Sequence, residues 1–181
     1  PEGEEPPVRS PLGADDGVRF RRGRLIHALL QTLPDLDAGE RPAAAAAFLA
    51  RSAPDLEDAV RAQIVEETLS VIEGPDFAPL FAPGSRAEVP IVGRVGDQVM
   101  SGQIDRLLVT DTEVTIVDYK TNRPPPAEPD HVPAIYLRQM AIYRTAVGEI
   151  YPGKSVRCLL LWTDGPSIMT VPEALTDRYV P

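Results

Sequence analysis

The chain has 181 residues, of which 43% are hydrophobic and 25% charged, as in an ordinary globular protein of one domain or one domain with an appendage. The net charge of −9 argues against a general nucleic-acid coat protein, because affinity for phosphate backbones requires clustered Lys and Arg. An enzyme with acidic metal ligands and a local basic patch remains compatible with it. The single cysteine, Cys158, excludes a disulfide framework and a cysteine zinc site, and we expect it to be a buried core residue.

The N-terminal segment, residues 1–16, is rich in Pro, Gly and acidic residues, and it predicts a linker or flexible arm. Residues 17–181 are then expected to form the folded domain. The sequence begins with Pro rather than Met, from which we expect a piece of a longer protein. No signal peptide and no apolar run of 18 residues is found, so we expect no membrane span and a cytoplasmic location.

Three helices are predicted in the first half of the chain. Apolar residues recur at helical spacing over residues 20–33, and Pro34 is expected to end this helix. A second helix is predicted over residues 41–52. A third is predicted over residues 55–74, where Gly74 supplies a stop signal.

The pattern then changes to strands. Residues 87–95, 98–110 and 113–122 are strand-like, and the turn signals Gly96-Asp97 and Asp111-Thr112 separate them. This arrangement predicts a meander of three antiparallel strands.

The last part of the chain returns to a helix and further strands. A rigid, Pro-rich loop is predicted over residues 122–130 and a helix over 133–150. An apolar, central strand is predicted over 155–164 and one more strand over 167–172. Helices, three strands, a helix and a strand indicate an α+β or mixed α/β fold.

Charged residues stand on an otherwise apolar strand face in the segment TIVDYKTN, residues 115–122. Residues two apart on a strand share a face, so Asp118 and Lys120 lie in line with Ile116. Asp105, on the preceding strand, is expected close to Asp118 at the end away from the turn. One interpretation is structural: a buried Asp–Lys ion pair, with Asp105 bound to Arg106 or to Arg123.

The other interpretation is a metal site. Two adjacent carboxylates repel each other unless one is protonated or a cation lies between them. Mg²⁺ prefers oxygen ligands and is often held by one or two carboxylates together with substrate phosphate. Lys120 beside such a cation could orient or deprotonate an attacking water, or neutralise charge on a phosphate.

The segment GQIDRLLVTDTEVTIVDYKTN resembles the core of the restriction-endonuclease-like nucleases, the PD-(D/E)XK superfamily. It is most similar to the group found at the C-terminus of RecB and of the AddA helicase–nuclease subunit, and the resemblance covers residues 18–171. That group has a His on an early helix after a Gly, a Glu just before the first strand, and a Gln and a Tyr four residues apart on the helix after the strands. The matching residues here are His27, Glu88, Gln139 and Tyr143.

The resemblance implies a fold and residue roles. The fold would be a central mixed sheet flanked by helices, with an additional N-terminal helical part. Asp105 and Asp118 would bind the metal, with the Tyr119 carbonyl and His27 completing the ligand set. Lys120 would be the catalytic lysine and Glu88 an acid beside the metal, and Gln139 and Tyr143 would support the site or contact DNA.

The implied function is a DNA exonuclease domain that depends on Mg²⁺ or Mn²⁺ and acts at single-stranded DNA ends during double-strand break repair. Its partners would be helicase domains of the parent chain, which would handle ATP, and an AddB-like subunit. The alternative is a nuclease fold that has lost activity and serves as a binding module. Metal binding without cleavage would favour that alternative.

Two further features bear on binding. Residues 148–155, GEIYPGKS, match the P-loop pattern, but they follow a predicted helix and precede a strand, the reverse of a P-loop's context, so we expect no nucleotide site. Four arginines stand just ahead of His27 and could contact DNA phosphates, or form a helix start or docking surface. They are Arg19, Arg21, Arg22 and Arg24.

Overall fold

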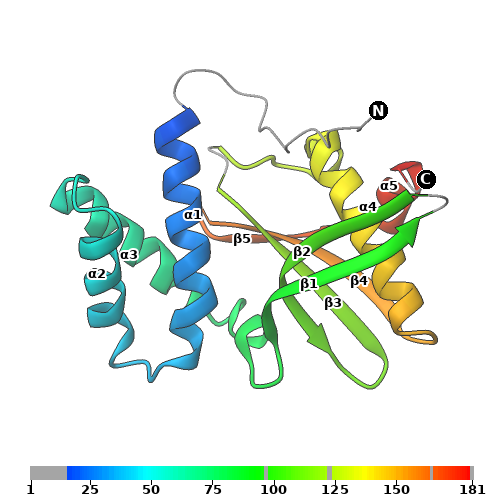
Figure 1. The fold of residues 1–181 in the computed structure, drawn as a ribbon, viewed down its shortest axis with the longest axis horizontal. Helices are drawn as coiled ribbons and strands as arrows, with labels where there is room; N and C mark the ends of the chain where they lie inside the picture. Colours follow the sequence, from blue (N-terminus) through cyan, green and yellow to red (C-terminus); the bar gives the residue numbers. More distant parts are fainter. Residues whose placement is uncertain (1–15, 96–97, 122–123, 164, 180–181) are drawn as a thin grey trace.

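The computed structural model describes residues 16–95, 98–121, 124–163 and 165–179, with side chains described from residue 21 and not over 93–100. Within these ranges the predicted helices and strands occur in the predicted order, and a short helix at Glu173–Thr176 was not predicted (Figure 1). The helices and strands are α1 Asp16–Thr32, α2 Arg41–Ser52, α3 Asp58–Glu73, β1 Arg86–Val95, β2 Gln98–Val109, β3 Glu113–Lys120, α4 Ala134–Ile150, β4 Ser155–Trp162, β5 Ser167–Val171 and α5 Glu173–Thr176. The predicted Gly96-Asp97 turn and Arg123 lie outside the described residues.

The N-terminal helices confirm the periodicity, with small corrections at their ends. Helix α1 begins at Asp16, the last residue of the predicted arm. It ends at Thr32, and Pro34 lies inside the 3₁₀ turn Leu33–Asp35 that follows rather than marking the end of the helix itself. Proline fits there because the first residues of a helical turn need no amide donor. Gly74 ends α3 as its C-cap.

The five strands form one mixed sheet in the order β1-β2-β3-β4-β5. The first three strands form the predicted antiparallel meander. Strand β4 runs parallel to β3 and lies between β3 and β5, so the apolar segment predicted as central has neighbours on both sides. Six consecutive residues of β3, Val114–Tyr119, are buried, which explains why the sequence of this strand is largely apolar.

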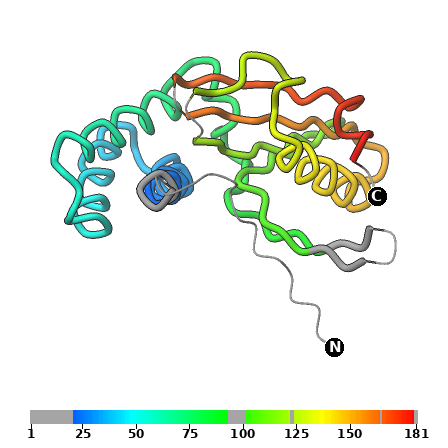
Figure 2. Tube along the Cα trace, turned by 90° about the horizontal axis from the view of Figure 1, so that it is seen from above, coloured from blue at the N-terminus to red at the C-terminus, as the bar shows by residue number. Residues whose placement is uncertain are grey.

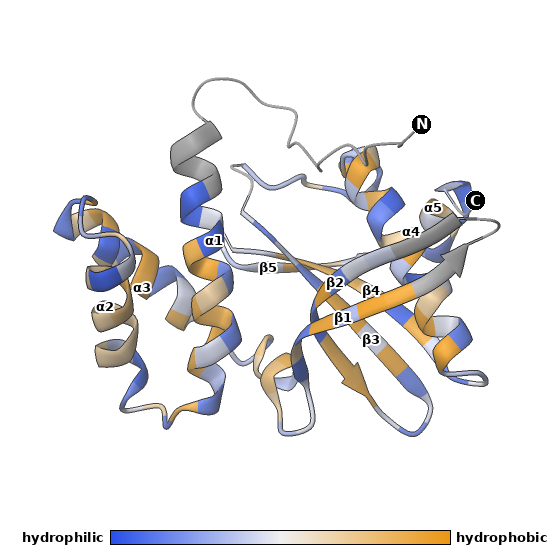
Figure 3. Cartoon of the chain, viewed as in Figure 1, coloured by the Kyte–Doolittle hydropathy of each residue, from blue (hydrophilic) through white to orange (hydrophobic). Residues whose placement is uncertain are grey.

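Each face of the sheet packs against helices. One core joins buried residues of α1, α2 and α3 to Val117 and Tyr119 of β3 and to Leu159 and Leu161 of β4. The opposite core joins α4 to the alternate residues of the same strands, among them Ile116. Helix α2 and the start of α3 lie beyond α1, away from the sheet (Figures 1 and 2). Hydrophobic residues accordingly lie along the strands and also on α1 and α4 (Figure 3).

The sequence GEIYPGKS forms the turn between α4 and β4, as expected from its context. Lys154, which a P-loop would place on phosphates, donates hydrogen bonds to the carbonyl oxygens of Thr110 and Asp111, the latter at 2.8 Å. It therefore ties this turn to the one between β2 and β3. No helix follows the turn, so its amides have no helix N-terminus to join. None of the helices in the described part of the chain combines the length and apolar character that crossing a membrane requires.

Cys158 is buried in β4, and burial raises the pKa of its thiol to about 12. Because the thiolate is the reactive form, we expect the folded protein to resist alkylation by iodoacetamide at pH 8. Unfolding in guanidinium should expose one reactive thiol per chain. Mass spectrometry of the alkylated protein checks this, and rapid labelling of the folded chain would contradict the buried position.

Candidate active site

Asp105 and Asp118 meet between β2 and β3, as the strand pattern predicts. The ladder of these strands ends with Arg106 paired with Val117, so Asp105 and Asp118 are the next residues on either strand. There the Asp105 side chain bonds to the backbone of β3: its Oδ2 accepts a hydrogen bond of 2.7 Å from the Tyr119 amide. Asp105 is thus fixed to the strand that carries Asp118 and Lys120.

His27 reaches the same place from α1. Its Nδ1 lies 3.5 Å from Asp105 Oδ1, and its Nε2 lies 3.2 Å from the Tyr119 carbonyl oxygen. Gly23, one turn earlier, permits this approach, since a Cβ at that position would come within 2.9 Å of the Thr121 hydroxyl. Burial lowers the pKa of His27, but the hydrogen bond and charge of Asp105 outweigh it and the net shift is upward. The carboxylate of Asp105 and the carbonyl of Tyr119 both favour the protonated, positively charged form of the imidazole.

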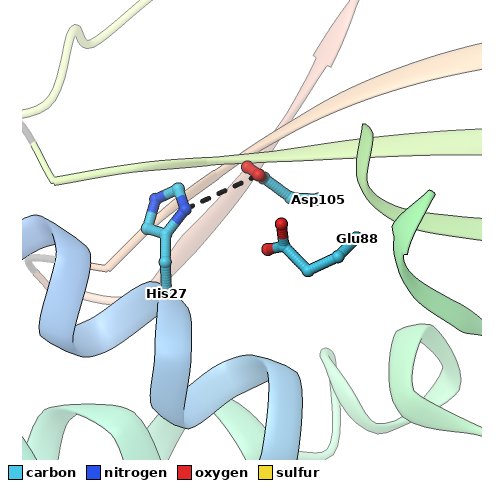
Figure 4. Close-up of side chains that lie close together, drawn as sticks. All are labelled: His27, Glu88 and Asp105. Atoms are coloured by element: carbon cyan, nitrogen blue, oxygen red, sulfur yellow. Dashed lines mark ion pairs between the residues drawn. The ribbon is translucent and has the colours of Figure 1, made fainter. Parts of the chain in front are cut away.

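Glu88 completes a group of three. It lies within β1 as its third residue, so the expectation that it precedes the strand is wrong. Its backbone has a φ of 51°, which is rare for a residue other than glycine and aims the side chain away from the regular pleat. Figure 4 shows Glu88 pointing toward Asp105 and His27. Burial and the charge of Asp105 raise its pKa.

These residues fit a hard divalent cation. One ligand atom each of His27, Glu88 and Asp105 lies within 4.8 Å of the others. The pKa of Glu88 is raised because its charge is partly buried and is repelled by Asp105. A bound cation would offset both effects. The Tyr119 carbonyl oxygen adjoins this group, because it contacts Nε2 of His27. The set thus contains three of the predicted ligands together with the predicted acid Glu88.

Asp118 and Lys120 form a buried ion pair beside this group. The side chains of Asp118 and Lys120 are only 4% and 12% exposed. Burial lowers the pKa of Lys120, but the Asp118 charge outweighs it and holds the ammonium protonated. The Lys120 ammonium contacts Asp118 Oδ2, so this carboxylate oxygen is engaged in the ion pair. The structural ion pair considered from the sequence is therefore present within the predicted site.

Gln139 and Tyr143 support this pair from α4. Lys120 Nζ donates a hydrogen bond of 3.1 Å to Gln139 Oε1, and Gln139 Nε2 donates one of 3.2 Å to the Tyr143 hydroxyl. That hydroxyl in turn donates to the Gln103 carbonyl at 2.8 Å. The chain of bonds links β3, α4 and β2, so it fixes the position of the Lys120 ammonium relative to Asp105.

Sequence comparison identifies the chemistry that this arrangement serves. A family model of the PD-(D/E)XK nuclease superfamily matches residues 8–173. The chain belongs to this superfamily. It is therefore a nuclease domain of the kind that works with divalent metals, and its mixed sheet flanked by helices is consistent with a restriction-endonuclease-like core.

Other comparisons add little. A crystal structure of the protein SSO0001 is similar over 92% of this chain and 84% of that one, with 16% sequence identity and a TM-score of 0.37. That similarity is too low to support an argument about this nuclease domain. No match was found among curated proteins.

The arginines ahead of His27 are only partly available to DNA. Arg21 binds Asp55 through two hydrogen bonds of 2.5 and 2.6 Å, and Arg22 forms a half-buried ion pair with Glu67. Arg21 thus ties α1 to the segment between α2 and α3, and Arg22 ties it to α3. Arg24 is exposed on α1, and the side chain of Arg19 lies outside the described part.

Two residues have roles that the sequence did not predict. Arg106, considered as a partner of Asp105, is instead buried and hydrogen-bonds Tyr119, Ser85 and Leu30, whereas Asp105 pairs with His27. Tyr136 lies beneath the Lys120 ammonium. An arginine directly after the predicted metal ligand Asp105, on a buried strand, was a signal for the first. The spacing of Tyr136 three residues before Gln139 was a signal for the second.

Gly102 allows Tyr143 to reach β2. A Cβ at residue 102 would lie 2.7 Å from Cε1 and 3.0 Å from the hydroxyl of Tyr143. We therefore expect Gly102→Ala to displace the ring, to break its bond to Gln103 and to lower nuclease activity about tenfold, with a stability loss of about 1–3 kcal/mol. Steady-state cleavage and thermal unfolding measure the two effects.

Gly148→Ala provides the matched control. Gly148 lies in α4, and nothing stands within 4 Å of a Cβ added there. Alanine in a helix should leave activity unchanged and stability equal or slightly higher. If Gly102→Ala behaved like Gly148→Ala, the contact between residue 102 and Tyr143 would not matter to the site.

Proposed function

We propose that this domain is a DNA exonuclease that hydrolyses phosphodiester bonds at DNA ends, with single strands as its substrate and Mg²⁺ or Mn²⁺ as its cofactor. The observation that carries the proposal is the convergence of His27, Glu88 and Asp105 within reach of Lys120, which stands one residue after the Tyr119 carbonyl. Membership of the PD-(D/E)XK superfamily supports the phosphodiester as the bond that is broken.

The side chains have separate tasks in this proposal. His27, Asp105 and the Tyr119 carbonyl would hold the metal, with Glu88 and Asp118 contributing carboxylate oxygens from either side. A bound divalent cation supplies Lewis-acid stabilisation of the scissile phosphate and a lower pKa of an attacking water.

Lys120 would act on the reacting phosphate and water. Its ammonium is held by Asp118 and Gln139 in the structure, so its position is fixed before substrate arrives. A fixed positive charge stabilises negative charge that develops on the phosphate, and it orients a water for attack. Preorganisation of this kind costs no rearrangement during the reaction.

The proposed setting is a helicase–nuclease of the AddA type that works in double-strand break repair in the bacterial cytoplasm. In it, helicase domains of the parent chain would consume ATP and deliver single strands, and an AddB-like subunit would complete the enzyme. The resemblance of residues 18–171 to RecB-like nuclease domains supports this setting. The exposed Arg24 on the His27 helix is a candidate phosphate contact for the delivered strand.

A pair of substrates tests the exonuclease proposal. Linear single-stranded DNA with a terminal label and the same sequence closed into a circle should be incubated with the chain and Mn²⁺, without ATP. An exonuclease releases label from the linear strand and leaves the circle intact. Cutting of the circle would replace the proposal with an endonuclease. Metal binding with no cleavage of either substrate would favour the inactive binding module.

A further inference from the structure

The aromatic ring of Tyr136 supports the ammonium group of Lys120. Lys120 Nζ lies 4.1 Å from the centre of the Tyr136 ring, within the range in which a cation is attracted to the face of an aromatic ring. The side chain of Lys120 is 12% exposed, so water screens this attraction weakly. The ring contact is additional to the ion pair with Asp118 and the hydrogen bond to Gln139.

The fold fixes the ring in this position. Tyr136 belongs to the first turn of α4, and Gln139 and Tyr143 follow at spacings of three and seven, so the three side chains share one helix face. Tyr136 also lies near Trp162, with ring centres 6.4 Å apart and planes tilted by 58°. Trp162 is buried and pairs with Lys120 across the parallel strands β3 and β4.

We infer that Tyr136 is a positioning residue for the nuclease reaction, and that the face of its ring holds the Lys120 ammonium where it can act on the scissile phosphate. The inference rests on the proposed role of Lys120. The ion pair with Asp118 and the hydrogen bond to Gln139 engage two of the three ammonium donors. The ring lies beneath the charge, and the third ammonium donor would bind the substrate phosphate in this proposal.

The lysine content of the chain permits a direct test of the contact. Lys120 and Lys154 are the only lysines, so a protein labelled with ¹³C at lysine Cε gives two methylene signals. A methylene above an aromatic ring is shifted upfield by the ring current. Lys154 binds backbone carbonyls at a distant turn and serves as the internal reference.

We expect an upfield Lys120 signal that persists in Tyr136→Phe and moves to the ordinary lysine position in Tyr136→Leu. An unshifted Lys120 signal in the parent protein, or a shifted one that survives Tyr136→Leu, would overturn the inference. Because this measurement requires no cleavage, an inactive chain with a shifted signal would count against the proposed nuclease function and not against the contact.

Cleavage kinetics then test whether the contact matters to the reaction. Tyr136→Leu should lower kcat about tenfold with little change in KM for DNA, whereas Tyr136→Phe should retain most of kcat. Replacing Tyr136 with phenylalanine and then with its mono-, di- and trifluorinated analogues weakens the ring's attraction for a cation at nearly constant size. We expect kcat to fall progressively along that series. Equal rates along the series, or full activity of Tyr136→Leu, would contradict a positioning role.

Discussion

Replacing Asp105 with asparagine is expected to lower metal-dependent cleavage on the order of 10³-fold while leaving the domain folded. Asp105 touches two of the elements that build the site: its oxygens contact His27 and the Tyr119 amide, and one lies within 4.8 Å of a Glu88 ligand atom. Asparagine has the same shape, and its carbonyl oxygen can still accept the Tyr119 amide. It lacks the negative charge that attracts a divalent cation.

Two measurements separate metal binding from folding in this variant. Calorimetric titration with Mn²⁺ should show affinity reduced about 10- to 100-fold or more, and the thermal unfolding midpoint of the metal-free protein should stay near that of the parent. Asp111→Asn provides the control, because Asp111 is an exposed aspartate at the turn between the same two strands. Parental cleavage by Asp105→Asn would remove Asp105 from the metal site.

Replacing Arg106 with methionine is expected to destabilise the domain by about 3 kcal/mol. The buried guanidinium donates to the Tyr119 hydroxyl at 2.9 Å, to the Ser85 hydroxyl at 2.7 Å and to the Leu30 carbonyl at 3.0 Å, and it lies over the Phe81 ring. Methionine fills much of the volume but leaves these acceptors without their donor. Denaturant unfolding of the metal-free protein measures the loss.

The same substitution should also weaken metal binding, because the partners of Arg106 carry the site. Leu30 belongs to the His27 helix, Ser85 precedes the strand of Glu88, and the backbone of Tyr119 contacts both His27 and Asp105. Arg157→Met is the matched control, since Arg157 is exposed on β4 and its hydrogen bond to Thr170 is long, at 3.4 Å. If the two variants had equal stability, Arg106 would not join these elements as the structure indicates.

Features that depend on local pattern were predictable from the sequence. The alternation of side chains along a strand placed Asp118 and Lys120 on one face, and the short turn at Asp111 brought Asp105 to the strand that carries them. Spacing of four on α4 placed Gln139 beside Tyr143. In each case the decisive contact follows from the geometry of one element or one hairpin.

Features that depend on distant contacts were not predictable in the same way. The parallel pairing of β3 with β4, which places Trp162 beside Lys120, is a choice among several topologies. The left-handed backbone of Glu88 has no local sequence signal, because such a conformation persists only where surrounding packing imposes it. Arg21 and Arg22 were predicted as a basic cluster, but their acidic partners, Asp55 and Glu67, lie 34 and 45 residues away.

The nuclease assignment is tested by cleavage of labelled DNA with Mg²⁺, Mn²⁺ or EDTA, using the parent chain, Lys120→Ala and Lys154→Ala. These lysines are the only two in the chain. Lys154 hydrogen-bonds the Asp111 carbonyl oxygen at the turn between β2 and β3, away from the site. We expect cleavage that requires metal, that persists in Lys154→Ala and that Lys120→Ala abolishes. Cleavage that continues in EDTA, or that survives in Lys120→Ala, would contradict a metal-dependent reaction at this site.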